Sequence, residues 1–417
     1  MITLPHHVEL LSDHWLEKAR EFLEREVAAR RERLGARPFS VSERLTDAPP
    51  HLKQPNDVAQ WSFRYDGEKL RVSREFDSGA DVVVEADYQV ALLVAQAVGA
   101  LAPGVMPHAL REIAHLFGKD AIRSRGLLKD AAARELVGLL HDHMARRTVE
   151  NPDLAHRARR LGIASKVREV EANGYTVLER AITPEFADEL RDATLRALLP
   201  HNTFTLQWML YQGHEFERIA QHAQLMTLID ASLGRGAVIG SLSSIRRGPG
   251  PGQIPLHTDY SMVPEPYPEF AMTGVGVWSF EDWTVASGPT WIIPGSHRNR
   301  RGPRAGDSKD GGVPIEMPKG SVVYFTHGVW HWQGERTEPG ERVTLHSHFN
   351  RGILRSLEPK RVDVQMMHRN PPRLGEMLGE DDWFDKLGPN GRDQLRAAYM
   401  AQLQAFTDRR KLELLAG

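Results

Sequence analysis

The sequence predicts two folded parts: a small α+β domain, and a mainly β domain whose short strands suit a jelly-roll barrel. The first observation is length, because 417 residues are enough for two or three domains with separate cores. The second is pattern, because helical periodicity and strand-like runs alternate over the first 150 residues. The third is chemistry, since residues able to bind a metal accompany the short apolar runs of the second half.

An amphipathic helix is predicted to open the first domain, over Ser12–Leu34. Apolar residues recur there every three or four positions, and Gly35 supplies a stop. Four strand-like runs follow, and Asp66-Gly67 between the second and third is a two-residue hairpin signal. The apolar helix positions are Trp15, Ala19, Phe22, Leu23 and Val27, and the runs are Phe39–Leu45, Val58–Tyr65, Lys69–Phe76 and Ala80–Glu85.

Two further helices complete the domain predicted at 1–150, a buried one over Tyr88–Ala100 and an amphipathic one over Lys129–Arg146. The order of elements resembles the sterol carrier protein fold, which implies a hydrophobic cavity able to hold a lipid tail. The alternative is a scaffold or dimerisation domain with a filled core, so a homodimer stays open. Residues 151–165 are interpreted as a polar helical linker.

The most informative motif of the second half is His257-Thr258-Asp259. Side chains two residues apart on a strand point to the same side, so the imidazole and the carboxylate would share one face. They are two-thirds of the 2-His-1-carboxylate triad, which binds non-haem Fe(II) and leaves positions open for cosubstrate and oxygen. Because such triplets also occur by chance, a second histidine and an anion anchor are needed to support this interpretation.

A second histidine and an anchoring arginine follow downstream. Val322–Phe325 is a β-branched and aromatic run typical of a buried strand, and His331 lies just past its end. Arg342, eleven residues later, opens another strand-like run. Its guanidinium can form a bidentate, charge-assisted pair with the distal carboxylate of a dicarboxylic keto acid. We expect adjacent antiparallel strands to bring His331 and Arg342 to one pocket.

These motifs, in this order, resemble the phytanoyl-CoA dioxygenase family of Fe(II)/2-oxoglutarate oxygenases over roughly residues 165 to 358. The resemblance implies a double-stranded β-helix at 166–358, with His257, Asp259 and His331 as iron ligands and Arg342 as the 2-oxoglutarate anchor. The further matching segments are Asn173–Leu178 with Ile182–Phe186, Val275–Trp278, Gly288–His297 and Trp330-His331.

The resemblance also implies a reaction. Fe(II), 2-oxoglutarate and O2 would take part, with ascorbate as an activator. A C–H bond of a small-molecule substrate would be oxidised while 2-oxoglutarate gives succinate and carbon dioxide. Family members that halogenate have glycine at the carboxylate position, whereas this chain has Asp259, so hydroxylation or a related oxidation is expected. The sequence does not identify the substrate; a lipid-binding N-terminal domain would favour a hydrophobic or carrier-bound one.

Other histidines have competing interpretations. His327 is the nearest rival to His331 as third ligand, but the spacing from His331 to Arg342 fits the family better. His346 and His348 alternate on a strand and could mimic a metal pair, although one face of a barrel strand explains them more simply. We expect His297, which ends a Pro-Gly-Ser-His turn, to be structural or to lie next to the site.

Two tryptophans and a group of serines complete the candidates. Trp278 and Trp291 are interpreted as core or pocket-wall aromatics, because large aromatics mainly contribute buried area. The stretch Ser241–Ser244 precedes the metal motif on a strand-like run. In the family this region often gives a polar contact to 2-oxoglutarate. Ser244 is a candidate for that contact, but the match is ambiguous by two residues.

Two segments outside the motifs have open roles. Arg298 to Pro314 is rich in Gly and Pro and contains four arginines. It is either a solvated loop or a lid whose arginines meet an anionic substrate. The tail, 359–417, is predicted to be a helical extension that packs on the barrel.

Composition excludes several classes of function. The 53 basic and 55 acidic residues give a net charge of −2, with no bias toward nucleic acid or a membrane surface. Without cysteine there are no disulfides, zinc-thiolate sites or cysteine nucleophiles. The N-terminus lacks the pattern of a signal peptide, and no stretch reaches the ~18 to 20 apolar residues of a membrane span. We therefore expect a soluble cytoplasmic protein.

Two other classes compete with the oxygenase. One is a metal-dependent isomerase or hydrolase on a cupin-like barrel, using the same ligands. Arg342 argues against it, because that chemistry needs no dicarboxylate anchor. The other is a lipid-binding protein with an inactive barrel, and the complete triad argues against that.

Overall fold

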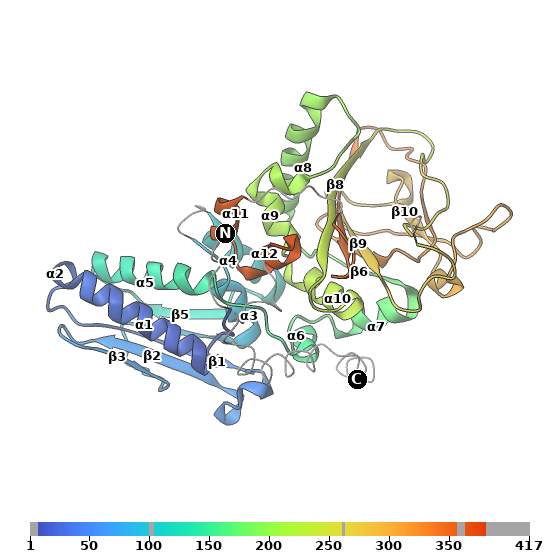
Figure 1. The fold of residues 1–417 in the computed structure, drawn as a ribbon. Coiled ribbons are helices and arrows are strands. Elements are labelled where there is room, and N and C mark those ends of the chain that lie inside the picture. Colours follow the sequence, from blue (N-terminus) through green and yellow to red (C-terminus); the bar gives the residue numbers. More distant parts are fainter. Residues whose placement is uncertain (1–6, 100–103, 261–262, 357–362, 381–417) are drawn as a thin grey trace. The chain divides into compact units, whose positions relative to one another are not determined.

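The computed structural model describes residues 7–99, 104–260, 263–356 and 363–380 (Figure 1). Its contacts divide the chain into two compact units. The N-terminal unit is formed mainly by Met1–Arg160 with Val362–Gly375, and the C-terminal unit mainly by Leu161–Arg361. The division falls between Arg160 and Leu161, inside the segment interpreted as a linker.

A five-stranded sheet, ordered β3-β2-β1-β4-β5, is the centre of the N-terminal unit. β1 is parallel to β4, and the other neighbours are antiparallel. Apolar side chains alternate along β2, so one face of the sheet can pack against helices. The strands are β1 Phe39–Thr46, β2 Ala59–Tyr65, β3 Leu70–Ser73, β4 Val82–Asp87 and β5 Ile122–Gly126.

Helices α1 and α5 pack against each other over this unit's core (Figure 1). Ser12 caps α1, since its hydroxyl accepts a hydrogen bond from the Trp15 backbone N–H at 3.1 Å. The single helix predicted over Ser12–Leu34 is divided at Arg30, which has φ −111° and ψ 14°. The helices are α1 Asp13–Ala29, α2 Arg31–Leu34, α3 Tyr88–Ala95, α4 Val105–Phe117, α5 Ala131–Ala145 and α6 Leu154–Arg160.

Two further details of this unit differ from the sequence prediction. The hairpin between β2 and β3 has four residues between the paired Tyr65 and Leu70, not two, and the Asp66 carboxylate accepts hydrogen bonds from the Glu68 and Lys69 backbone N–H groups within it. The predicted polar linker is partly a buried helix. Asn151 is fully buried, and His156 Nε2 lies 2.9 Å from the Asp47 carbonyl oxygen.

The C-terminal unit contains two sheets, and both consist of antiparallel neighbours. The larger sheet has the order β6-β12-β9-β14-β8-β7, and the smaller has the order β11-β10-β13. The described strands form no closed barrel. The strands are β6 Tyr175–Leu178, β7 Thr205–Leu206, β8 Val238–Arg247, β9 Thr273–Ser279, β10 Thr290–Ile292, β11 Val313–Pro314, β12 Val322–Thr326, β13 His331–Gln333 and β14 Arg342–Asn350.

Helices cover one face of the larger sheet, where α10 contacts β9 and α8 contacts β14 (Figure 1). Trp278, on that side of β9, is fully buried and packs edge-on against His222. Because side chains alternate along a strand, the opposite face is available for a site. The helices are α7 Ala164–Asn173, α8 Pro184–Leu198, α9 His214–Ala220 and α10 Ala223–Leu233.

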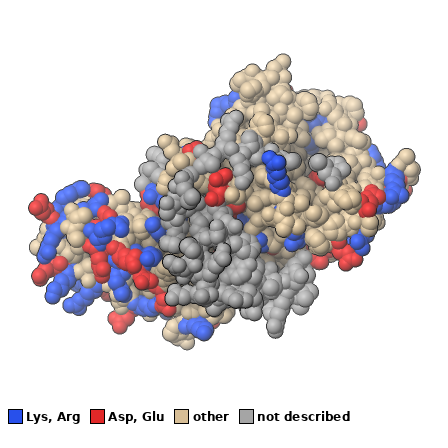
Figure 2. Space-filling view, viewed as in Figure 1, with Lys and Arg blue, Asp and Glu red and all other residues tan. Residues whose placement is uncertain are grey.

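The described tail contains α11 Val364–His368 and α12 Pro372–Leu378. Val362–Gly375 groups with the N-terminal unit, and the described residues after Gly375 group with the C-terminal unit, whereas the whole tail was expected on the barrel. The part of the predicted helical extension beyond residue 380 lies outside the described residues. Within the described ranges, no helix is long and apolar enough to cross a membrane. Figure 2 shows basic and acidic side chains intermingled over the region of α1, α5 and β3, in keeping with the small net charge.

Candidate metal and anion site

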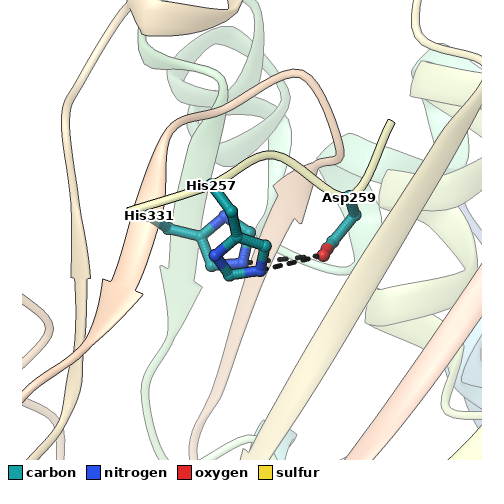
Figure 3. Close-up of side chains that lie close together, drawn as sticks. All are labelled: His257, Asp259 and His331. Atoms are coloured by element: carbon teal, nitrogen blue, oxygen red, sulfur yellow. Dashed lines mark ion pairs between the residues drawn. The ribbon is translucent and has the colours of Figure 1, made fainter. Parts of the chain in front are cut away.

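His257, Asp259 and His331 converge in the C-terminal unit (Figure 3). The Nε2 atoms of His257 and His331 lie 3.3 and 3.8 Å from Asp259 Oδ1, and the centroids of the two imidazole rings are 4.1 Å apart. One ligand atom from each residue lies within 4.8 Å of the other two. Two imidazole nitrogens and a carboxylate oxygen so close together can hold one metal ion.

The predicted placement of His257 and Asp259 on a regular strand is wrong, because the triplet belongs to an irregular segment. An isolated bridge joins it to β13: the backbone N–H groups of His257 and His331 each donate to the other residue's carbonyl oxygen at 3.0 Å. The Asp259 N–H then donates to the His327 carbonyl oxygen at 3.1 Å. These long-range hydrogen bonds bring the two side chains to one side.

The other ring nitrogen of each histidine is held by the backbone. His257 Nδ1 lies 2.9 Å from the Pro255 carbonyl oxygen, and His331 Nδ1 lies 3.0 Å from the Val329 carbonyl oxygen. A carbonyl oxygen can only accept, so each Nδ1 carries a proton, and in the neutral form of each ring Nε2 is left with the lone pair that a metal ion would take. This is the tautomer that a metal-binding histidine needs.

The electrostatics favour an ionised carboxylate among these imidazoles. Burial opposes ionisation of Asp259, but the charges of His327 and His331 and a hydrogen bond to His257 outweigh it and hold its pKa well below the usual value. Burial lowers the pKa of His331. Burial also acts to lower the pKa of His257, but the interaction with Asp259 outweighs it and raises that pKa.

The three residues line a cavity of about 210 Å³ that also contains Arg342. The expectation that adjacent strands bring His331 and Arg342 together is wrong, because β13 and β14 belong to different sheets. The cavity instead lies between side chains of both sheets. Thr290 and Gln333 line it from the smaller sheet, and Ser243 lines it from the larger.

Arg342 is only 4% exposed, and its guanidinium lies over the Trp283 ring at 5.0 Å. It donates to the Gly288 carbonyl oxygen. Gly288 has φ +71°, and a Cβ there would lie 2.8 Å from the Arg336 backbone nitrogen, so glycine is needed at this position.

The environment of Arg342 is cationic. Burial, with the charges of Arg247 and Arg336, lowers the pKa of Arg342 to about 9. The carboxylate of Glu281 is 2.8 Å from Arg336, with which it pairs. Within the described part of the chain, the buried Nε of Arg342 has no hydrogen-bond acceptor. A buried cation with an unused donor is a suitable anchor for an anion.

A second group of ligand atoms shares Asp259. His327 Nε2 lies 3.5 Å from Asp259 Oδ2 and 3.4 Å from His348 Nδ1. His346 stacks on His348 with ring centroids 6.0 Å apart, and both line the cavity. The sequence interpretation of His346 and His348 as one face of a strand agrees with their alternation along β14.

Two candidate residues point away from the cavity. Ser244 is the wrong serine, because its hydroxyl lies 3.5 Å from the Leu206 carbonyl oxygen and from Met209 Sδ, whereas the next residue back, Ser243, lines the cavity. Trp278 is on the helix-covered face of β9, where its indole N–H donates to Ser347 Oγ at 3.3 Å. It is a core aromatic and has no part in the cavity wall.

Trp291 lies next to the cavity lining, whereas His297 lies elsewhere. The ring of Trp291 stacks on Trp332, a lining residue, with centroids 5.6 Å apart. His297 lines a separate cavity of about 320 Å³, together with Tyr260 and Phe270. Thr290 and Gln333 were missed as lining residues, whereas Ser243 was among the serines that the sequence left open.

Ion pairs fix the conformation of the arginine-rich loop. Arg301 pairs with Asp307 at 2.7 Å, Arg304 with Glu265 at 2.9 Å, and Arg300 with Glu269 at 2.9 Å. The Trp330 indole N–H donates to the Arg301 carbonyl oxygen at 2.9 Å, and the Arg301 guanidinium covers that ring. These contacts support the interpretation as a folded surface loop.

Residues 210–342 match the family described as phytanoyl-CoA dioxygenase (PhyH). The range contains His257, Asp259 and His331 and ends at Arg342. The resemblance inferred from the motifs is therefore confirmed for this part of the chain.

Curated relatives and solved structures add to the comparison. Dioxygenase af480 of Aspergillus fumigatus is 27% identical over 158 residues, which are 37% of this chain and 51% of that protein. Dioxygenase FUM3 of Gibberella moniliformis is 34% identical over 118 residues, 26% of this chain and 36% of that protein. The chain thus spans about half the length of these relatives or less. The structure of HygX from Streptomyces hygroscopicus, with nickel and 2-oxoglutarate bound, matches with a TM-score of 0.40 and 13% identity. The match covers 45% of this chain and 87% of the HygX chain.

Proposed function

We propose that this chain, whose residues 210–342 resemble the phytanoyl-CoA dioxygenase family, is an Fe(II)- and 2-oxoglutarate-dependent oxygenase acting on a small organic molecule. The observation that carries the proposal is one cavity containing both the His257, Asp259 and His331 cluster and the buried cation of Arg342. A cupin-like isomerase or hydrolase would use the metal cluster but has no need of the arginine.

The donor set fits ferrous iron. Two histidines held as the Nε2-presenting tautomer and one ionised carboxylate form the facial arrangement typical of non-haem Fe(II) oxygenases. When bound, the iron would supply dioxygen activation coupled to the oxidative decarboxylation of 2-oxoglutarate to succinate and carbon dioxide. The presence of Asp259, where halogenating relatives of the family have glycine, favours hydroxylation or a related C–H oxidation.

Arg342 would bind the distal carboxylate of 2-oxoglutarate through its unused Nε donor. Its contacts with Gly288 and Trp283 hold the guanidinium, so little side-chain freedom is lost when the anion binds. The surrounding Val275, Val277 and Phe325 are apolar cavity walls that exclude water from the reacting centre.

The larger and smaller sheets would be the two walls of a double-stranded β-helix. The bridge between His257 and His331 supports this arrangement, because it adds a fourth segment to the smaller sheet next to β13. His257 and Asp259 would then enter the site from the rim of one wall, and Arg342 from the other.

The test is succinate formation from 2-oxoglutarate by the full chain, supplied with Fe(II), O2 and ascorbate. Succinate forms from 2-oxoglutarate whichever molecule is oxidised, so the assay can be run with an extract of small molecules before the substrate is known. We expect succinate that depends on Fe(II) and on Arg342, and an increase when a substrate is found among cellular small molecules. If no succinate forms under any of these conditions, including with an extract of small molecules, the proposal is wrong.

A further inference from the structure

The Asp259 carboxylate faces two different sets of imidazoles. Its Oδ1 lies toward His257 and His331, and its Oδ2 lies 3.5 Å from His327 Nε2. His348 Nδ1 is 3.4 Å from the same His327 nitrogen. Asp259, His327 and His348 therefore form a second cluster, whose ligand atoms also lie within 4.8 Å of one another.

The spacing of this second cluster suits a tetrahedral ion. Ligand atoms at about 2.0–2.1 Å from a tetrahedral zinc ion are about 3.3–3.4 Å apart. The two distances that His327 makes, 3.5 and 3.4 Å, are close to that edge length. In the first cluster the two distances from Asp259 Oδ1 are 3.3 and 3.8 Å, which is a similar range.

A hydrogen bond within the protein also orients a ligand of the second cluster. His327 is 6% exposed, and its Nδ1 is hydrogen-bonded to the Thr273 hydroxyl, which orients the ring so that Nε2 points at Asp259.

We propose that Asp259, His327 and His348 are an alternative binding site for a divalent transition-metal cation with zinc-like preferences. Both positions depend on the one negative charge of Asp259, so a metal ion bound at one position is expected to weaken binding at the other. A zinc ion in the second position would draw Asp259 away from His257 and His331. It would thus compete with the metal of the first cluster.

The inference uses the Asp259 of the proposed oxygenase site but not its activity. A first cluster acting alone would still support the oxygenase, and a second cluster that binds zinc would do so in an inactive protein. The two proposals can therefore fail separately.

The test measures zinc binding after the first cluster is removed. In a His257→Gln, His331→Gln variant of the full chain, equilibrium dialysis with metal analysis is expected to find one bound Zn²⁺. Adding His348→Gln should lower that affinity by more than about 100-fold, because even a partner outside the ligand set commonly contributes 10- to 100-fold. Adding His346→Gln is the matched control, because His346 stacks on His348 but belongs to neither cluster, and it should leave the affinity unchanged.

Spectroscopy and a second background complete the design. Co²⁺ in place of Zn²⁺ should give the intense visible absorption of a tetrahedral site, and His348→Gln should abolish it. Thermal melting verifies that each variant is folded. The comparison of His348→Gln with His346→Gln is also repeated in a variant that carries only His331→Gln. The proposal is overturned if the variant without the first cluster binds no Zn²⁺, or if His348→Gln and His346→Gln have the same effect.

Discussion

The buried sheet faces of the two units carry different side chains, aromatic ones in the N-terminal unit and charged or imidazole ones in the C-terminal unit. In the N-terminal unit, the inward face of β2 carries Trp61 and Phe63, and Trp61 packs edge-on against Trp15 of α1 with ring centroids 5.0 Å apart. In the C-terminal unit, the cavity face of β14 carries Arg342 and His348. Both faces arise from the same two-residue alternation of a strand.

The difference shows which buried surface is built for stability and which for binding. Aromatic side chains on the N-terminal sheet stabilise the fold by leaving water. A buried arginine and buried histidines cost free energy unless a partner compensates them. In the C-terminal unit much of that compensation would come from ligands, so substitutions there should change binding and turnover more than folding.

Asp259→Ala is the strongest test of the binding surface. Turnover of 2-oxoglutarate to succinate should fall by more than about 100-fold, because losing even a residue that supports a ligand commonly costs about 10- to 100-fold. Glu269→Ala is the control, since Glu269 is an exposed carboxylate that pairs with Arg300 in the same unit. Full activity of the Asp259 variant would remove this residue from the metal site.

Phe63→Ala tests the opposite surface. Phe63 is 1% exposed, and truncating a buried phenylalanine costs about 3–5 kcal/mol of unfolding free energy. Arg64→Ala, on the exposed side of the same strand, should change it by no more than about 0.5 kcal/mol. Denaturant unfolding gives both values. Below the transition, the Phe63 variant should keep its turnover number; a loss comparable with that of Asp259→Ala would mean that the N-terminal core is not a purely structural surface.

The two surfaces also differ in how far the sequence predicted them. In the N-terminal unit, α1, α5 and four strands were predicted from apolar periodicity, because their buried residues recur regularly. Strand β5 was missed for a physical reason, because it is exposed at four of its five residues and so has no apolar stripe. Helix α4 was overlooked although Met106, Leu110, Ile113 and Phe117 recur at helical spacing along it.

In the C-terminal unit the metal-binding residues were predicted from motif order, but their setting was not. His257 and Asp259 share a side because of hydrogen bonds to residues about seventy positions away, which no local pattern reveals. The error at Ser244 has a simpler cause: a shift of one residue along a strand moves a side chain to the opposite face. The second cluster brings three segments together in space, so its members were noticed separately in the sequence but not as one group.

Arg342→Met separates anion binding from stability within the cavity. A hydrogen bond to a charged group contributes about 1.5–3 kcal/mol, so the KM for 2-oxoglutarate should rise by about 10- to 100-fold. Arg247→Met is the informative partner, because Arg247 sits opposite Arg342 on β8 and donates to the carbonyl oxygens of Gly334 and Gly250 at 2.9 Å. It should lower the melting temperature more than Arg342→Met does. Equal effects of both on KM would mean that the anchor is a shared cationic patch.

The smallest effect is expected in the arginine-rich loop, which belongs to neither buried surface. Hydrogen bonds from Arg301 and from the Arg304 backbone lower the pKa of Asp307 from 3.8 to about 2. A lowered folded-state pKa gives stability that is fully present above the unfolded value and is lost as pH falls through the folded one. Wild type should therefore melt slightly above Asp307→Asn at pH 5 to 7, and the gap should close between about pH 4 and pH 2. Asp310→Asn, in the same loop but without an ion pair in the described part of the chain, should produce no such closing gap. A gap that persists at pH 2 would show that Asp307 holds the loop by something other than its charge.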